Sequence, residues 1–153
     1  MPGKLLVELQ QTQPFSSLEE EAVLNLRRTA DLMEREMSAV LKPYTLSSVQ
    51  YNVLRILRGA GAEGAHCKKV GERMVTPEPD VTRLVDRLEQ RGFVFRQRTE
   101  KDRRFVTVCI TQEGLDLLAS LDQPVREVSY KTLHRLGSEK LNTLIGLLEE
   151  IRV

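Results

Sequence analysis

The sequence predicts a mainly helical fold that carries one small β-hairpin, and three observations support this prediction. Apolar residues recur at helical spacing in long segments before residue 60 and after residue 111. Two β-rich segments, 93–98 and 105–110, flank six residues that are nearly all polar or charged. Gly92 stands between the first of these strands and an apolar helical repeat, where a helix commonly ends. A helix followed by a hairpin is the arrangement of a winged helix.

Two segments have the sequence of a capping box, in which a serine and a glutamate or glutamine three residues later satisfy free amides at a helix start. The first box, 17–20, predicts a long helix that runs to about Leu41 and is stopped by Pro43. The second box, 47–50, predicts a helix that ends at Gly59.

The middle of the chain is expected to hold two more helices. Residues 59–64 are rich in glycine and predict a flexible connection to a short helix over 67–74. The next helix is expected over about 76–91. Because prolines are tolerated in a first helical turn, Thr76 or Glu78 is expected to cap it. Its predicted apolar face consists of Val81, Leu84, Val85 and Leu88.

The carboxyl-terminal part is predicted to be helical again. Thr111 begins a helix rich in leucine, Pro124 can kink it, and Gly137 precedes a last helix. The outer helices carry more apolar surface than a small winged helix needs, which indicates a dimer interface built from the chain ends. The expected organisation is 1–44 as the amino-terminal part of a dimerisation region, 45–111 as a winged helix-turn-helix DNA-binding domain, and 112–153 as the carboxyl-terminal part of the dimerisation region.

Positive charge is concentrated in one segment. The whole chain has a net charge of +1, yet residues 83–104 contain eight basic and four acidic residues. A local basic surface is typical of nucleic-acid binding. One alternative is a merely solvated hairpin, because edge strands often carry charge that prevents aggregation. Another is a winged helix that serves protein-protein contacts without specific DNA binding.

Composition and motifs argue against several classes of protein. No segment approaches the roughly 20 apolar residues of a membrane span, and a signal peptide is not expected. Two cysteines without a CxxC motif suit a reducing cytoplasm. No enzymatic activity is expected, because the chain has two histidines, no nucleophile elbow and no phosphate-binding glycine loop. His66 and Cys67 lack further ligands at a suitable spacing, so neither a metal nor a cofactor is expected. Cys67 could be reactive near a helix start, and Cys109 could face either side of its strand.

The sequence between Asp86 and Gly114 carries a more specific pattern. Asp86-Arg-Leu-Glu, Gly92-Phe-Val, Asp102-Arg-Arg104 and Ile110-Thr-Gln-Glu-Gly114 follow one another with the spacing of a helix, a wing and a second helix. In these residues, and over nearly its whole length, the chain resembles the MarR family of bacterial transcriptional regulators. The resemblance implies a triangular homodimer that binds double-stranded DNA, most often as a repressor. It also implies a response to a small phenolic or anionic effector.

The resemblance further implies how DNA is bound. The helix over 76–91 would enter the major groove, and Arg104 would reach the minor groove, held by Asp102 in a bidentate pose. The other basic side chains would mainly contact phosphates, which supply affinity without reading sequence. A two-fold dimer would read a pseudo-palindromic operator. The candidate DNA-binding residues are Thr76, Glu78, Asp80, Thr82, Arg83, Lys68, Lys69, Arg96, Arg98, Lys101, Asp102, Arg103 and Arg104.

Some residues keep alternative interpretations. Glu78 and Asp80 could accept a hydrogen bond from cytosine N4, or could only stabilise the positive end of the helix. Arg87 and Arg91 are expected to be ion-paired on the surface of their helix. Met33, Met37, Tyr44 and Tyr51 lie where the family holds its effectors. Methionines at helical spacing are more often core residues, so no effector-binding residue is assigned.

Overall fold

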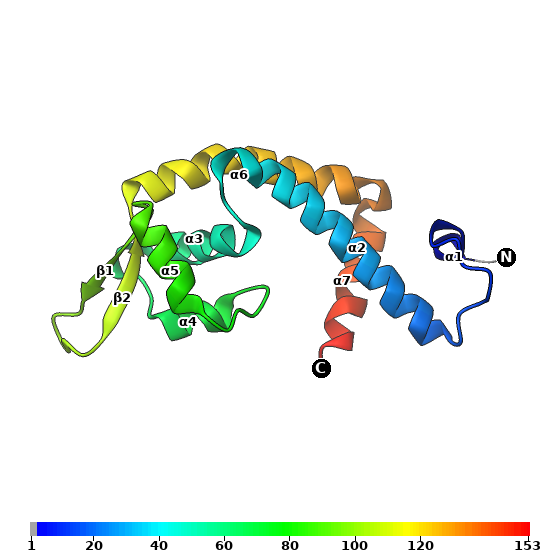
Figure 1. The fold of residues 1–153 in the computed structure, drawn as a ribbon, viewed down its shortest axis with the longest axis horizontal. Helices are drawn as coiled ribbons and strands as arrows, with labels where there is room; N and C mark the ends of the chain where they lie inside the picture. Colours follow the sequence, from blue (N-terminus) through cyan, green and yellow to red (C-terminus); the bar gives the residue numbers. More distant parts are fainter. Residues whose placement is uncertain (1–2) are drawn as a thin grey trace.

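The computed structural model describes residues 3–153, and within them the chain is mainly helical with a single two-stranded antiparallel sheet (Figure 1). The predicted fold class is confirmed. No helix in this part of the chain is both long and apolar enough to cross a membrane. In chain order the elements are α1 (Lys4–Glu8), α2 (Leu18–Leu41), η1 (Lys42–Tyr44), α3 (Ser48–Ala60), η2 (Gly61–Glu63), α4 (Cys67–Arg73), α5 (Val81–Gln90), β1 (Val94–Arg98), β2 (Val106–Ile110), α6 (Gln112–Leu133), η3 (His134–Leu136) and α7 (Gly137–Ile151).

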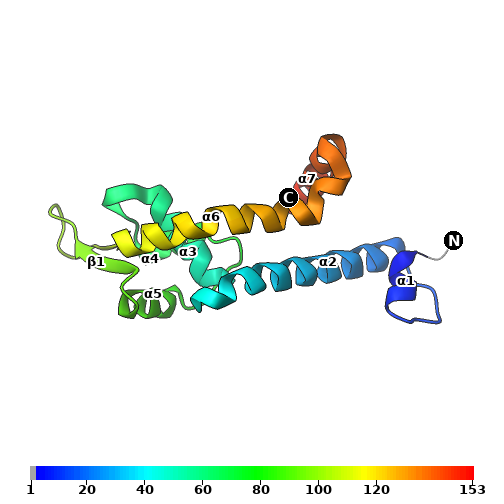
Figure 2. The same ribbon diagram turned by 90° about the horizontal axis from the view of Figure 1, so that it is seen from above.

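Two long helices connect the two ends of the molecule. α2 and α6 lie side by side, and α3, α4, α5 and the hairpin lie at one end of this pair (Figure 1, Figure 2). α1 and α7 lie at the other end, and the sequence pattern does not predict α1. Several large apolar side chains at this second end remain exposed in the single chain, among them Leu18, Val23, Ile145 and Leu147.

One hydrophobic core holds the winged helix together. Leu54 and Leu57 of α3, Leu88 of α5, and Leu118 and Leu121 of α6 are fully buried in it. Burying one such side chain stabilises a fold by roughly 1.5–3 kcal/mol. The first half of α6 therefore packs as part of the winged helix, while its second half extends toward α7 (Figure 1). The division of the chain after residues 44 and 111 stays a prediction.

Both predicted helix starts are present, but only one capping box is complete. Ser47 Oγ accepts from the Gln50 amide at 3.2 Å, and Gln50 Oε1 accepts from the Ser47 amide at 3.0 Å. Ser17 Oγ likewise accepts from the Glu20 amide at 3.2 Å. The Glu20 carboxylate, however, accepts from the amide of Ser16, one residue earlier than the box requires, at 2.6 Å.

The connection between α3 and α4 is an ordered turn, so the expectation of a flexible segment is wrong. α3 ends at Ala60, one residue later than predicted, because the positive φ of 68° falls on Gly61. The Ala65 amide then donates to the carbonyl of Val108 at 3.0 Å, and the Val108 amide donates to the carbonyl of Ala65 at 2.8 Å. These two bonds attach the turn to β2.

α5 begins at Val81, so the prediction of a helix from about Thr76 is wrong, and neither Thr76 nor Glu78 caps it. The cap is Asp80, whose Oδ1 accepts from the Arg83 amide at 3.0 Å. The reason is local: a residue that precedes proline is pushed away from the helical region, and Thr76 and Glu78 both precede prolines. The predicted apolar face is confirmed, with Val85 and Leu88 fully buried.

The hairpin and the helix after it follow the prediction closely. β1 and β2 pair in a register that places Arg96 opposite Val108. Gly92 ends the preceding helix with a φ of 77°. Thr111 caps α6, because its Oγ1 accepts from the Gly114 amide at 3.1 Å. α6 continues through Pro124 without a break.

An ion pair connects α3 to the middle of the long helix α6. Arg58 of α3 donates from Nη1 and Nη2 to the two carboxylate oxygens of Asp122 in α6, each at 3.0 Å. A bidentate arginine-carboxylate pair fixes orientation as well as distance. The pair therefore limits how far α3 can rotate against α6.

We expect this ion pair to stabilise the fold in a pH-dependent way. Hydrogen bonds from Arg58 lower the pKa of Asp122 below its ordinary value of 3.8. A carboxylate with a lowered pKa in the folded state contributes its stability above the unfolded-state value and loses it as pH falls through the folded-state value. Because the two side chains are 31% and 39% exposed, Asp122→Asn should lower the free energy of unfolding by only about 0.5–1 kcal/mol at neutral pH.

Urea denaturation from neutral pH down to the lowest pH at which the protein stays folded checks this prediction. The difference between wild type and Asp122→Asn should shrink as the solution becomes more acidic. Asp31→Asn is the matched control, because Asp31 pairs with Arg35 on a single helix and both side chains are more than 60% exposed. It should change stability little at any pH. A constant difference for Asp122→Asn at every pH would contradict the prediction.

Candidate nucleic-acid interface

α5 buries one face and exposes the other, as a recognition helix must. Leu84, Val85 and Leu88 are buried, whereas Thr82 and Arg83 are exposed on its first turn. The capping bond of Asp80 occupies one of its carboxylate oxygens, and the negative charge lies at the positive end of the helix. Asp80 therefore has a structural role that needs no DNA.

The segment before α5 is tied to α3. The Val75 amide donates to Oδ1 of Asn52 at 2.8 Å. Thr76 and Glu78 lie in this segment and not on the helix. Two prolines restrict the rest of the backbone up to the cap of α5. Any base contact by Thr76 or Glu78 would therefore come from a loop in front of the helix.

Arg96 joins the hairpin to α5. Its Nη2 donates to Oδ1 of Asp86 at 2.6 Å, its Nη1 donates to Oε1 of Glu89 at 2.9 Å, and its amide donates to Oε2 of Glu89 at 3.1 Å. Partial burial by itself would lower the pKa of Arg96, but the bonds and charges of the two carboxylates outweigh it and raise this pKa. The ion pairs hold the wing at a defined angle to α5.

The tip of the wing is an ordered turn that presents Arg104. The Thr99 amide donates to the carbonyl of Phe105 at 3.2 Å, and Thr99 Oγ1 donates to the carbonyl of Asp102 at 2.8 Å. Asp102 Oδ1 accepts from both the amide and the Nε of Arg104, at 3.0 and 3.4 Å. The expected bidentate pose is wrong, because one carboxylate oxygen makes both bonds. The Arg104 side chain is 91% exposed, with its outer N–H groups free among the described residues.

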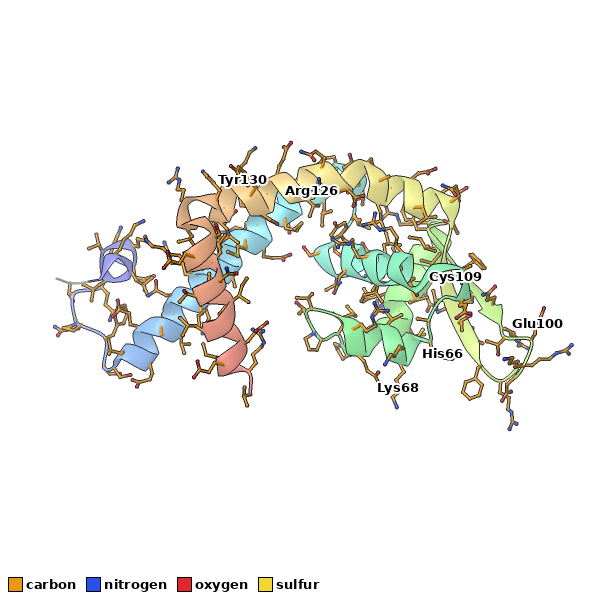
Figure 3. The ribbon with its side chains drawn as sticks, turned by 180° about the vertical axis from the view of Figure 1, so that it is seen from behind. His66, Lys68, Glu100, Cys109, Arg126 and Tyr130 are labelled. Carbon is orange, nitrogen blue, oxygen red and sulfur yellow. The ribbon has the colours of Figure 1, made fainter. Side chains whose placement is uncertain are left out.

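The remaining basic residues differ in how far they are engaged within the fold. Arg98, Lys101 and Arg103 are exposed on the wing, and in the described chain they make no ion pair. Lys69 of α4 lies 3.4 Å from Glu72, while Lys68 points away from the fold (Figure 3).

Neither Arg87 of α5 nor Arg91, the residue just after α5, forms the ion pair that the sequence predicts among the described residues. Arg91 donates instead to the backbone carbonyls of Tyr44 and Thr45, at 2.7 and 2.6 Å. Arg87 is exposed, and within residues 3–153 it has no acidic partner.

A groove of about 1020 Å³ lies between α2 and α3. Met33, Met37 and Tyr51 line it, whereas Tyr44 does not. Val75 and Thr76, from the segment before α5, also line it. The groove therefore touches both a long helix and the chain that leads into α5. Its charged lining residues are Asp31, Glu34, Arg55 and Arg73.

Comparison with known proteins identifies the family to which the winged helix belongs. The sequence profile of the MarR family matches residues 46–106. The HTH-type transcriptional regulator PecS from Dickeya dadantii is 30% identical over 129 residues, which cover 82% of this chain and 78% of PecS. The chain belongs to the MarR family.

Solved structures of the MarR family have the same architecture. A MarR transcription factor from Planctomyces limnophilus is 41% identical, with a TM-score of 0.68 over 88% of this chain and 98% of that chain. CouR from Rhodococcus jostii, solved with bound p-coumaroyl-CoA, is 25% identical, with a TM-score of 0.76 over 90% of this chain and 95% of CouR. This MarR-family chain is therefore a transcriptional regulator with a DNA-binding winged helix.

The two cysteines of this MarR-family regulator differ in their surroundings. Cys109 is buried, with its Sγ 3.6 Å from the carbonyl of Ala62, and this burial raises the pKa of the Cys109 thiol. Cys67 is half-buried at the first turn of α4. In the part of the chain that the structure describes, no three potential metal-ligating side chains gather at one place.

Sequence reasoning missed the structural roles of three residues in this MarR-family interface: Arg96 was expected to bind DNA, Arg91 was expected in an ion pair, and Asn52 was not singled out. Asn52 fixes the segment before α5. Arg91, just after α5, donates to the carbonyls of Tyr44 in η1 and of Thr45 after it, and Arg96 connects β1 to α5. Only the ion pairs of Arg96 could have been predicted from the sequence. Asp86 and Glu89 are three residues apart and so share one face of the helix, and a basic residue follows the glycine turn. The other two contacts join segments more than twenty residues apart and leave no local pattern.

Proposed function

We propose that this MarR-family regulator binds a pseudo-palindromic DNA operator as a homodimer and represses transcription. The observation that carries the proposal is the wing, where Asp102 orients a guanidinium that is 91% exposed beside an attached recognition helix. A narrow minor groove has enhanced negative potential and attracts an inserted arginine. α5 would lie in the adjacent major groove.

The proposed DNA contacts divide into three groups. Thr82 and Arg83, exposed on the first turn of α5, are assigned to base edges. Arg104 is assigned to the minor groove. Since Arg96 is already neutralised by two carboxylates, it is assigned to the attachment of the wing and not to a phosphate. The residues assigned to phosphates are Lys68, Lys69, Arg98, Lys101 and Arg103.

The ends of the chain support the proposed dimer. Exposed apolar side chains commonly mark a protein interface, and at the end of the molecule away from the wing they include Val7 of α1, Leu18 and Val23 of α2, and Ile145 and Leu147 of α7. A second copy that covers this surface would place two winged helices on one side of the dimer. Two-fold symmetry would then match two half-sites about one helical turn apart.

The groove between α2 and α3 is proposed as the effector site. CouR was solved with p-coumaroyl-CoA, a phenolic and anionic compound, which supports a small ligand of this class here. Arg55 and Arg73 in the lining could bind an anionic group. An effector that prefers one spacing of the winged helices would shift the population away from the DNA-binding arrangement. We propose no catalytic reaction and no cofactor, and we place the protein with its DNA in the cytoplasm.

Fluorescence anisotropy with a DNA fragment from beside the protein's own gene tests this proposal, over a series of salt concentrations. Wild type should bind this fragment more tightly than random DNA, with an affinity that falls steeply as salt rises. Arg104→Ala should weaken binding about 10- to 100-fold and make the salt dependence less steep, because one inserted cation is lost. The folded state should be unaffected, since the Arg104 side chain is almost fully exposed.

Lys131→Ala is the matched control, because it removes one exposed positive charge from the far end of α6. It should leave DNA affinity unchanged. Equal affinity for the promoter fragment and random DNA at every salt concentration, with no effect of Arg104→Ala, would overturn the proposal. That result would favour a winged helix used for protein contacts.

A further inference from the structure

His66 lies where the first turn of α4 meets the hairpin. Its Nδ1 is 3.0 Å from the carbonyl oxygen of Val106, at the start of β2. Its ring also packs against the ring of Phe105, with centroids 5.5 Å apart and an angle of 57° between the planes. Figure 3 shows His66 between Lys68 and the hairpin. Two contacts near the tip of the wing therefore fix an exposed imidazole.

The carbonyl partner determines which ring nitrogen carries hydrogen. A backbone carbonyl oxygen only accepts hydrogen bonds, so Nδ1 must be the donor. In the neutral ring Nε2 is then an acceptor, and within residues 3–153 no protein donor reaches it. A phosphate oxygen is an acceptor as well. Nε2 can therefore bond to a phosphate only after the ring takes up a second proton.

The charges around His66 favour an anion. On α4, Lys68 makes no ion pair with any residue from 3 to 153, and Lys69 pairs with Glu72, while Glu63 lies on η2. On the wing, the three charged residues that precede Phe105 in the chain are Asp102, Arg103 and Arg104, with Asp102 engaged by Arg104. No carboxylate of the described chain pairs with His66. Basic groups of α4 and of the wing thus flank the imidazole without an acidic partner for it.

We propose that His66, in its protonated form, donates from Nε2 to a backbone phosphate of duplex DNA. This inference rests on the proposed DNA-binding function and adds a property to it, namely that DNA binding takes up a proton. Imidazole is the side chain that ordinarily changes charge between about pH 5 and 8. DNA affinity accordingly falls as pH rises through this range, because the neutral ring offers the phosphate an acceptor.

The size of the pH effect on DNA affinity follows from the coupling between proton binding and DNA binding. If the phosphate moves the titration of the imidazole by about one half to one pH unit, affinity differs about three- to tenfold between the protonated and neutral limits. The contact reads no sequence, so the same dependence holds for the operator and for random duplex DNA.

Anisotropy measurements at about pH 6 and pH 8, at constant ionic strength, test the proposal. Wild type should bind about three- to tenfold more tightly at the lower pH. His66→Asn should remove this difference, because the asparagine amide can still donate to Val106 but has no group in place of Nε2. His134→Asn is the matched control: His134 is the other histidine, stacked on Tyr130 at the end of α6, and its replacement should keep the pH dependence.

A second measurement does not depend on variants. The C2-proton resonance of His66, followed by NMR during a pH titration, should move its midpoint to higher pH when random duplex DNA is added, while that of His134 should not. Wild type that binds DNA equally at both pH values, or an unmoved His66 midpoint, would overturn the inference alone. Failure of the wild type to bind any DNA would overturn the proposed function together with it.

Discussion

Gly64→Ala is expected to lower the free energy of unfolding by about 3–5 kcal/mol, a large share of the stability of a domain. Gly64 has a φ of 68° and a ψ of −161°, a region that essentially only glycine adopts. A Cβ at this position would also meet the carbonyl oxygen of Val108 and the Sγ of Cys109. The clash would push the turn away from β2 and break the pairing of Ala65 with Val108.

Gly61→Ala is a closely matched control. Gly61 has the same φ of 68°, but a Cβ there would meet no atom within 4 Å. It should therefore show only the backbone cost, about 1–3 kcal/mol. Thermal and urea denaturation of both variants check the prediction. Equal losses of stability would show that the close approach of β2 does not matter at Gly64.

Arg96→Ala is expected to weaken DNA binding about 10- to 100-fold and to lower the free energy of unfolding by about 1–2 kcal/mol. The stability loss is moderate because Asp86 and Glu89 are 52% and 41% exposed. The effect on binding is larger for two reasons. The wing loses its attachment to α5, and two carboxylates without a partner would then lie on the helix that approaches the phosphates.

Arg98→Ala is the matched control on β1. It distinguishes the loss of a phosphate contact from the loss of the attachment between the wing and α5. Arg98 lies two residues further along β1 and makes no ion pair within the described residues. Its replacement should weaken DNA binding modestly and reduce the salt dependence, with unchanged stability. Anisotropy and urea denaturation of both variants provide the comparison. If Arg96→Ala resembled Arg98→Ala in both measurements, Arg96 would be an ordinary phosphate contact.

Local signals predicted most of the fold. Ser47, Gly92 and Thr111 each act within a few residues of their own position, as a capping box, a positive φ and a helix cap. The apolar face of α5 is also present as predicted, because a surface helix buries only one face, and the two β-rich strands each begin one residue later than predicted. These features are visible in a single sequence since their causes are close in the chain.

The errors arose where two local rules competed or where distant segments met. A proline is tolerated at a helix start, yet it also disfavours helix at the residue before it, and the second effect decided the start at Val81. The turn at 61–64 reads as flexible by composition. It is fixed by β2, which lies more than forty residues later.

The sequence predicted which residues lie at the candidate site, but it did not predict the role of each residue. Resemblance to the family placed Arg104 at a wing tip, and the structure shows the side chain exposed there beside Asp102. Arg96 and Arg98 cannot be distinguished from the sequence alone, because both are arginines on the same predicted strand. Only the packing of β1 against α5 separates an internal ion pair from an exposed cation.

α6 belongs both to the winged helix and to the proposed dimerisation region. Its length therefore affects the distance between the two DNA half-sites that a dimer can bind. Its first half is buried in the winged helix and paired to α3 through Arg58, while its second half leads to the apolar chain ends. At 22 residues it is about 33 Å long. Adding one residue between these halves would turn one body about 100° against the other, whereas adding seven would nearly restore the angle and lengthen the helix by about 10 Å. In the proposed dimer, the phase and length of this one helix therefore determine which separation of half-sites the protein can bind.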